Sequence, residues 1–184
     1  MQERMMERDM LRRRFLEVAG ASVAAATAPA VLAQKSGTGP VLAPAPFVLS
    51  GTDMDGKTLT LKQYLGKACL ISFFTADCVL CENDLRLMRE FFGANKQRNY
   101  VNLGVNMDTD PAALAEYVRL IRLTIPVVQH FPILWRNAKT HSDNFGPITS
   151  EPTHFVLDKE HKLVVRRNGK FRPQDWDDLW TNLD

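Results

Sequence analysis

The sequence has few of the features that mark several large functional classes. Its formal net charge is only +2, from 23 Lys and Arg against 21 Asp and Glu, so the charge balance gives no support for nucleic-acid binding. It has no glycine-rich nucleotide fingerprint, which argues against a bound nicotinamide or flavin. No internal repeat is present, and the composition is ordinary for a globular protein. We therefore predict a globular protein that carries no organic cofactor.

Potential metal ligands are also scarce, with three cysteines and four histidines. A zinc site usually combines two closely spaced ligand pairs. The chain has a single Cys-x-x-Cys pair, Cys78 and Cys81, and six residues separate His154 from His161, which is outside the usual histidine spacing. The third cysteine, Cys69, lies inside an apolar run, where a buried and inert thiol is expected. We predict no metal site.

The chain lacks an apolar run long enough for a membrane helix. The Ala-rich run at residues 18–33 has 16 residues, fewer than the ~20 that a spanning helix needs. The segment before it, Leu11-Arg12-Arg13-Arg14-Phe15-Leu16-Glu17, resembles a twin-arginine signal, although its first and last residues depart from the usual form. Small residues before Gln34 predict cleavage there. An uncleaved membrane anchor is the alternative.

This interpretation divides the chain into three parts. Residues 1–33 are the expected signal peptide. Residues 34–45 are rich in Gly, Pro and Ser and are expected to form a flexible tether. Residues 46–184 then form one domain, and its cysteines would work in an oxidising compartment if the chain is exported.

The chemically informative stretch runs from Cys69 to Phe92. Residues 69–74 form an apolar, partly aromatic run, which predicts a buried strand, and residues 79–94 have helical periodicity. The Cys78–Cys81 pair lies where the strand gives way to the helix. Free backbone N–H groups and the positive end of the helix dipole lower the pKa of a thiol at that position. We expect Cys78 to be the exposed, attacking thiol and Cys81 the more buried one that resolves the mixed disulfide.

The remaining pattern indicates an α/β protein. Asp110-Pro111 predicts a helix start, Asp55-Gly56 a tight turn, and residues 129–135 fit either a strand or a helix. The expected strands are 47–49, 58–61, 69–74, 100–106, an extended piece beginning at 125–128, and a hairpin of 151–158 and 162–166. The expected helices are a short turn at 61–65, 79–94, one beginning at 110–111, and 173–183, while 137–150 is expected to be loop.

Together these motifs resemble the TlpA/ResA-like thiol–disulfide oxidoreductases of the thioredoxin superfamily. The likeness covers roughly residues 46–183. It rests on the turn at Asp55-Gly56-Lys57, Phe73-Phe74 before Cys78-Val79-Leu80-Cys81, residues 105–108, and Pro152-Thr153-His154-Phe155-Val156-Leu157-Asp158. It implies a thioredoxin-like fold, in which a central mixed β-sheet is flanked by helices and carries an N-terminal hairpin and a central βα insertion.

The resemblance also implies a second part of the site. Pro152 would be a cis proline packed against the cysteines, which would place the Glu151 backbone where a substrate strand can pair with it. Without the resemblance, a trans proline at a strand start would be expected. We expect Val79 and Leu80 to form an apolar rim that contacts the partner protein, together with Phe74 unless that residue is in the core.

Three departures from the family pattern concern charge and shape. Asp77 stands where the family usually has Trp, Val79-Leu80 replaces a proline-containing pair, and Glu151 precedes the proline. Carboxylates at Asp77 and Glu151 would raise the pKa of the Cys78 thiol against the effect of the helix, which favours a reductant over a strong oxidant. Asp77 could alternatively serve only as the N-cap of the helix.

Two other functions use the same cysteines. A copper chaperone would hold Cu(I) with two thiolates and a histidine, for which His154 is the only candidate. The cysteines of such chaperones have the spacing Cys-x-x-x-Cys, one residue longer than in this chain. A histidine on a strand more often faces solvent or packs sideways than binds a metal. A thiol peroxidase would use Thr75-x-x-Cys78, although Ile71 replaces the upstream proline of that signature. If the departures have silenced the site, the chain is instead a non-catalytic binding module.

The expected partners are protein thiols and disulfides of the cell envelope. Electrons would pass to or from another protein, because the chain has no fingerprint for a redox cofactor. The signal predicts a periplasmic location, with membrane attachment only if the signal segment stays uncleaved.

Overall fold

A computed structural model of the chain describes residues 45–183. The expected signal peptide, residues 1–33, and nearly all of the expected tether lie outside the described residues. The elements follow in this order: β1 (Leu49–Thr52), β2 (Thr58–Thr60), η2 (Leu61–Tyr64), β3 (Ala68–Phe74), α1 (Val79–Ala94), β4 (Tyr100–Asn106), α2 (Pro111–Thr124), η3 (Val127–Gln129), β5 (Ile133–Trp135), β6 (Ser142–Asp143), β7 (Thr153–Leu157), β8 (Leu163–Asn168) and α3 (Pro173–Thr181).

A five-stranded sheet with the order β5-β4-β3-β7-β8 forms the centre of the fold. β3 runs parallel to β4 and antiparallel to β7, so the sheet is mixed, as expected. Every residue of β3 is buried, which explains why its sequence is apolar apart from Ser72. The carboxyl ends of β3 and β4 meet where Phe74 pairs with Asn106, and α1 begins just beyond this end of β3.

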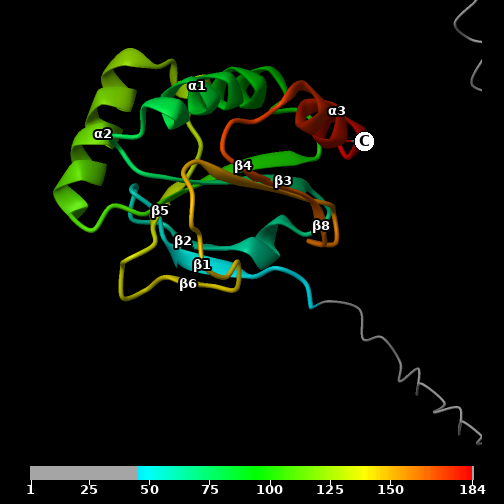
Figure 1. Ribbon diagram of the computed structural model, residues 1–184, viewed down its shortest axis with the longest axis horizontal. Coiled ribbons are helices and arrows are strands. Elements are labelled where there is room, and N and C mark those ends of the chain that lie inside the picture. The colour runs from blue at the N-terminus through cyan, green and yellow to red at the C-terminus, as the bar shows by residue number, and fades with distance from the viewer. Residues whose placement is uncertain (1–44, 184) are drawn as a thin grey trace, which may run out of the picture. The chain divides into compact units, whose positions relative to one another are not determined.

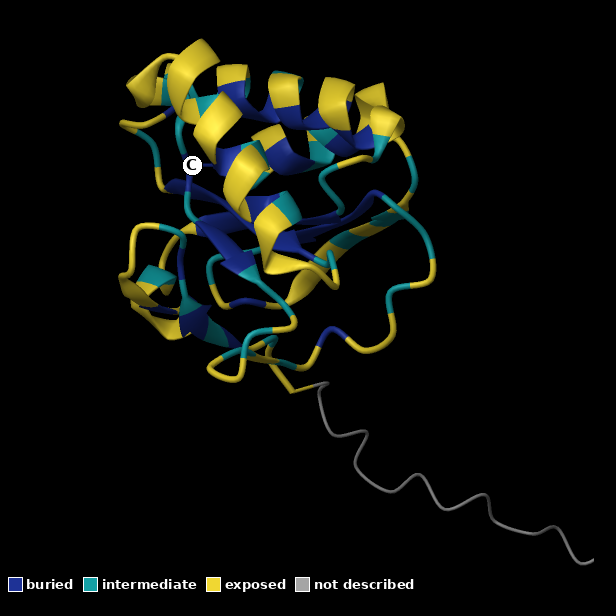
Figure 2. Ribbon diagram, turned by 90° about the vertical axis from the view of Figure 1, so that its left-hand side faces the viewer, coloured by how far each residue is buried: buried dark blue, intermediate teal, exposed yellow. Residues whose placement is uncertain are grey.

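The two faces of the sheet have different coverings. Alternate residues of β3, among them Leu70 and Phe74, share a core cluster with α1, α2 and α3. Ile71 and Phe73 belong to a second cluster with β1, β2 and Phe145. In Figure 1 the helices lie above the five-stranded sheet and a small β2-β1-β6 sheet lies below it. Figure 2 shows the buried residues between these layers and the exposed residues along the outer helix surfaces.

The N-terminal hairpin is formed by β1 and β2, which are antiparallel. Its Asp-Gly turn is present, with Gly56 at φ 77°, a conformation that glycine adopts without a steric penalty. Asp53 supports the turn by accepting hydrogen bonds from the N–H groups of Asp55 and Lys57. Asp53 also forms an isolated antiparallel bridge with Leu134 of β5, which joins the hairpin segment to the edge of the large sheet.

Several boundaries differ from the sequence expectation. The first strand begins at Leu49 instead of residue 47, and residues 127–129 form a helical turn where an extended segment was expected. The ambiguous stretch 129–135 contains the short strand β5, and the expected loop contains β6. β6 has only two residues and pairs with β1, more than 90 positions away, so no local pattern indicates it.

A cluster around Asp143 fixes the β6 segment. The Arg136 guanidinium donates to both oxygens of this carboxylate at 2.9 Å, and His141 lies 2.7 Å from it. The carboxylate also accepts the Phe145 N–H at 3.1 Å. Burial alone would raise the pKa of Asp143, but the bonds from His141, Arg136 and Phe145 together lower it to about 2.

Candidate functional site

The two cysteines lie at the start of α1, as predicted. Cys78 is the N-cap and Cys81 lies in the first turn, and their sulfurs form a disulfide with the Cα atoms 5.2 Å apart. The Sγ atom of Cys78 accepts a hydrogen bond from the Cys81 N–H at 3.1 Å. Cys78 is half-buried and Cys81 is 1% exposed. A backbone donor directed at the more accessible sulfur would stabilise a thiolate there.

The structure corrects the alternative role for Asp77. The helix is capped by Cys78 itself, whose backbone oxygen also accepts from Glu82 N–H at 3.2 Å. Asp77 is exposed and precedes the cap. Asp77 is therefore not the N-cap.

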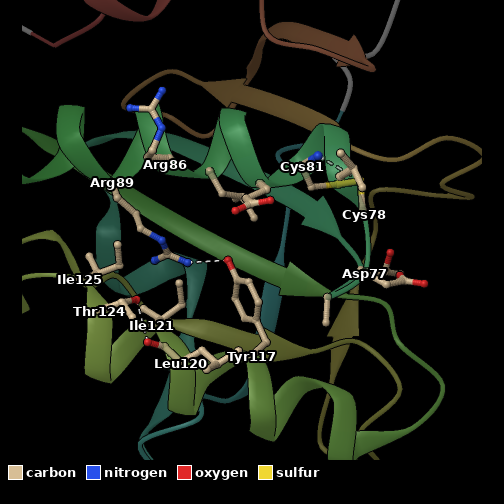
Figure 3. A pocket seen from close by; sticks show the side chains of 15 residues that line it. Asp77, Cys78, Cys81, Arg86, Arg89, Tyr117, Leu120, Ile121, Thr124 and Ile125 are labelled. Atoms are coloured by element: carbon tan, nitrogen blue, oxygen red, sulfur yellow. Dashed lines mark hydrogen bonds between the residues drawn. A yellow bond between two sulfur atoms is a disulfide. The ribbon is translucent and has the colours of Figure 1, made fainter.

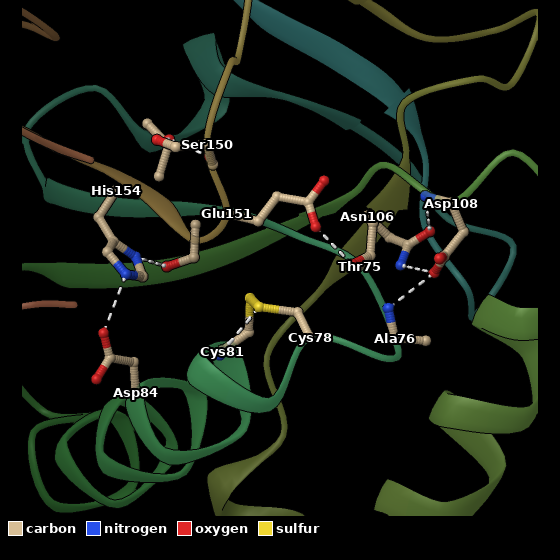
Figure 4. Close-up of a disulfide and its surroundings, with 12 residues drawn as sticks. Thr75, Ala76, Cys78, Cys81, Asp84, Asn106, Asp108, Ser150, Glu151 and His154 are labelled. Carbon is tan, nitrogen blue, oxygen red and sulfur yellow. Dashed lines mark hydrogen bonds and ion pairs between the residues drawn. A yellow bond between two sulfur atoms is a disulfide. The ribbon is translucent and has the colours of Figure 1, made fainter. Parts of the chain in front are cut away.

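The loop between β3 and α1 is held from two directions. The Thr75 hydroxyl donates to a Glu151 carboxylate oxygen at 2.5 Å. The Ala76 N–H donates to Oδ2 of Asp108 at 2.9 Å, and the Asn106 side-chain amide donates to that oxygen at 2.6 Å. Figure 4 shows these residues around the disulfide. Asp108 therefore positions the loop, a role that the sequence analysis did not assign.

The Glu151–Pro152 peptide bond is cis, as the resemblance implied. Pro152 is buried and Glu151 half-buried. In Figure 4 Glu151 lies on the opposite side of the disulfide from α1, with its carboxylate turned toward Thr75. The structure thus brings Glu151 together with the cysteine pair.

The first turn of α1 has an exposed apolar surface formed by Val79, 81% exposed, and Leu80, 63% exposed. The buried stripe of α1 includes Cys81 and Leu85, and Leu80 lies outside it. Phe74 is fully buried and belongs to the core.

A buried polar network lies beside the pair, and the sequence analysis missed it. Asp84 follows Cys81 by one helical turn on the same face of α1 and is 1% exposed. Its Oδ2 atom accepts the Phe171 N–H at 2.6 Å and lies 3.4 Å from Nε2 of His154. The Nδ1 atom of His154 is 3.0 Å from the Ser72 hydroxyl. A carboxyl and an imidazole in contact can pass a proton between them.

His154 was expected to face solvent or to pack sideways, and the second alternative is found. It is completely buried on β7. Burial, the strongest influence, lowers the pKa of His154 below its ordinary value, although Asp84 acts in the opposite direction. The ring is therefore neutral at pH 7 and packs edge-on against Phe171.

Cys69 is fully buried at the opposite end of β3, as expected. Burial raises the pKa of its thiol to about 12, so it is protonated and unreactive at physiological pH.

Residues 45–183 contain no group of three or more Cys, His, Asp and Glu side chains arranged to hold a metal ion. Within the same range no helix has the length and apolar character needed to cross a membrane.

Comparison with known proteins connects this geometry to a family. Residues 42–166 match the AhpC/TSA family. The chain is 28% identical over 122 residues to the thiol-disulfide oxidoreductase ResA of a Bacillus cereus strain, and this covers 65% of each chain. It is also 28% identical over 134 residues to the chloroplastic peroxiredoxin Q of Populus jackii, covering 72% of this chain and 61% of that one. The chain thus spans about 65% of the length of the first curated relatives that it matches.

Solved structures show the thioredoxin-like fold. The thiol:disulfide interchange protein of the thioredoxin family from Chlorobium tepidum TLS superposes with a TM-score of 0.60 at 22% identity. The superposition covers 77% of this chain and 96% of that one. The resemblance on which the sequence analysis relied is thereby confirmed for family and fold.

Proposed function

The chain belongs to the AhpC/TSA family, and we propose that it is a thiol–disulfide oxidoreductase that exchanges disulfides with partner proteins. The observation that carries this proposal is the Cys78–Cys81 disulfide at the N-terminus of α1, with one accessible and one buried sulfur. The similarity to ResA supports the same activity.

The reaction starts from the reduced pair. The Cys78 thiolate attacks one sulfur of a partner disulfide, and the other partner sulfur leaves as a thiolate. The Cys81 sulfur then attacks Cys78, releases the second partner thiol and leaves the Cys78–Cys81 disulfide. Two electrons move to the partner, and a second protein must return them.

The buried network serves the second step. Cys81 must lose its thiol proton before it attacks, and it is shielded from water. Asp84, one turn along the same face, accepts that proton directly or together with His154. Glu151 and Pro152 contact the backbone of the partner, Val79 and Leu80 contact its apolar side chains, and Asp77 tunes the pKa of the Cys78 thiol.

The deciding experiment is the reduction potential of the pair, measured by glutathione equilibration with mass-spectrometric readout. A value well below about −180 mV supports a reductant, and a value near about −120 mV supports an oxidant and contradicts our assignment of Asp77 and Glu151. Absence of any intramolecular disulfide would contradict the oxidoreductase function. A Cys69→Ala variant is the matched control, because it removes the cysteine that is distant from the pair.

A thiol peroxidase is the second candidate, supported by the match to peroxiredoxin Q and by Thr75-x-x-Cys78. Consumption of hydrogen peroxide with a thiol reductant distinguishes it from disulfide exchange. A copper chaperone has less support, because the two ring nitrogens of His154 face Ser72 and Asp84. Cu(I) titration tests that alternative.

The cellular setting follows from the N-terminal sequence. Residues 1–33 act as a twin-arginine-type signal peptide, residues 34–45 as a tether and residues 46–184 as the thioredoxin-like domain, and the enzyme works in the periplasm. Fractionation of cells that express the full chain tests this, and protein in the membrane fraction would indicate that the signal segment stays attached.

A further inference from the structure

A groove of about 430 Å³ begins at the cysteine pair and runs between α1 and α2. Cys78 and Cys81 line one end, and Thr124 and Ile125 line the other (Figure 3). Most of its lining is apolar, from residues such as Leu85. No element of the described chain, residues 45–183, fills this space.

A buried cation lines the same groove. Arg89 lies two turns after Cys81 on the same face of α1 and is only 2% exposed. One of its terminal nitrogens donates to the Tyr117 hydroxyl at 2.7 Å, and the guanidinium carbon lies 4.4 Å from the centre of the Phe131 ring. Figure 3 shows this side chain reaching across from α1 toward Tyr117 on α2.

The pairing of Arg89 is incomplete. Its other terminal nitrogen, Nη1, is buried and has no hydrogen-bond partner. Among the described residues no carboxylate forms an ion pair with it, whereas the exposed Arg86 nearby pairs with Glu90 at 2.7 Å. A buried charge normally has an opposite charge or a full set of hydrogen bonds, because its desolvation is costly. The aromatic rings supply only part of this compensation.

The other charges around the groove are exposed. Asp77, Glu82 and Arg86 also line it, and Glu82 is close enough to influence Tyr117. Water screens these exposed carboxylates, so the buried guanidinium is the strongest binding determinant inside the groove. Its chemistry favours a carboxylate ligand.

We propose that this groove binds an extended segment of the substrate protein and that Arg89 recognises an acidic side chain in it. This inference rests on the proposed function. Cys81 and Arg89 are separated by about 12 Å along the helix, from the 1.5 Å rise per residue. The long arginine side chain points back toward the helix N-terminus, so roughly three residues of extended peptide span the distance from Cys78. The preferred substrate carries Asp or Glu about three residues from its reacting cysteine.

The test uses short blocked peptides in which one cysteine is linked to 2-thiopyridine, a leaving group without a carboxylate. Cys78 attacks the peptide sulfur, 2-thiopyridone leaves, and Cys81 then displaces the peptide thiol. Peptides with Glu or Gln three residues from the cysteine, on either side, are compared by kcat/KM with the reduced enzyme. For the preferred side we expect the Glu peptide to react about tenfold faster than the Gln peptide, the effect of one charge-assisted hydrogen bond.

Variants identify the residue responsible. Arg89→Gln should bring the Glu-to-Gln ratio to about one, and Arg89→Lys should keep part of it. Arg119→Gln is the matched control and should keep the full ratio, because Arg119 is an exposed residue of α2 that pairs with Glu116 and does not line the groove. If Arg89→Gln does not fold, the Glu-to-Gln ratio of the wild-type enzyme still tests the inference.

Three outcomes separate the inference from its premise. A ratio near one in the wild type, with both peptides reduced, overturns the inference and leaves the proposed function intact. A ratio unchanged in a folded Arg89→Gln variant also overturns it. Failure to reduce either peptide on either side contradicts the proposed function itself.

Discussion

The buried carboxyl of Asp84 leads to an unusual stability prediction. Its Oδ2 atom accepts the Phe171 N–H and faces His154, whereas its Oδ1 atom is buried without a partner. Because burial keeps His154 neutral at pH 7, a charged Asp84 has no counter-ion in contact. Such a carboxylate costs stability, and a protein retains it mainly where function requires it.

Two substitutions separate the charge of Asp84 from its hydrogen bonds. Asp84→Asn can keep its amide oxygen in the place of Oδ2 and removes the charge, so we expect the free energy of unfolding to stay the same or rise by up to about 2 kcal/mol. Asp84→Ala leaves the Phe171 N–H buried without its acceptor. For one buried donor left unsatisfied we expect a loss of about 1–3 kcal/mol.

Urea unfolding followed by tryptophan fluorescence measures these differences. Stopped-flow oxidation by a peptide disulfide measures the function, and Asp84→Asn should slow release of the peptide thiol by on the order of 10²-fold, at the low end for a positioned proton acceptor. If Asn destabilises the protein as much as Ala does, the carboxylate charge is compensated and our reasoning is wrong. An unchanged rate in Asp84→Asn would exclude Asp84 as the proton acceptor.

Three further predictions concern the cysteine pair, Glu151 and the Asp143 cluster. Cys81→Ser should trap a covalent complex with a substrate protein, visible on a non-reducing gel, whereas Cys78→Ser should trap none. Glu151→Gln should raise the reduction potential by about 10–30 mV in glutathione equilibration, because loss of a nearby negative charge stabilises the thiolate; a fall would contradict this. Asp143 stabilises the fold above its ordinary pKa of 3.8, and this contribution is lost as the pH falls toward about 2. Asp143→Asn should therefore lose about 1–2 kcal/mol at pH 7, after allowance for solvent screening, and flatten the unfolding profile between pH 4 and 2.

The elements next to the cysteines were predictable because their patterns are local. The apolar run of β3 and the periodicity of α1 fixed both elements to within a residue, and Asp110-Pro111 marked the start of α2. The edge elements were not predictable in this way. β6 exists only through its pairing with β1, and the exposed valines at 127 and 128 resemble a strand although they form a helical turn.

The same distinction holds within the site. The cysteine pair and Pro152 are part of short motifs, so they could be identified from the sequence. Asp84 and Arg89 look like residues of a solvent-exposed helix face among Glu82, Arg86 and Glu90. They are buried because His154, Phe171 and Tyr117 come from distant parts of the chain and cover them, and no local pattern carries that information.

The two edges of the large sheet have a consequence for self-association. An unpaired strand edge can recruit a second copy and start aggregation. On one side β5 has only three residues, and Asp53 bridges to Leu134 within it. On the other side β8 presents the exposed Arg166, whose positive charge would face that of an approaching copy, whereas Arg167 is paired with Asp175 at 2.7 Å. Both edges of the large sheet therefore offer a second copy little backbone to pair with.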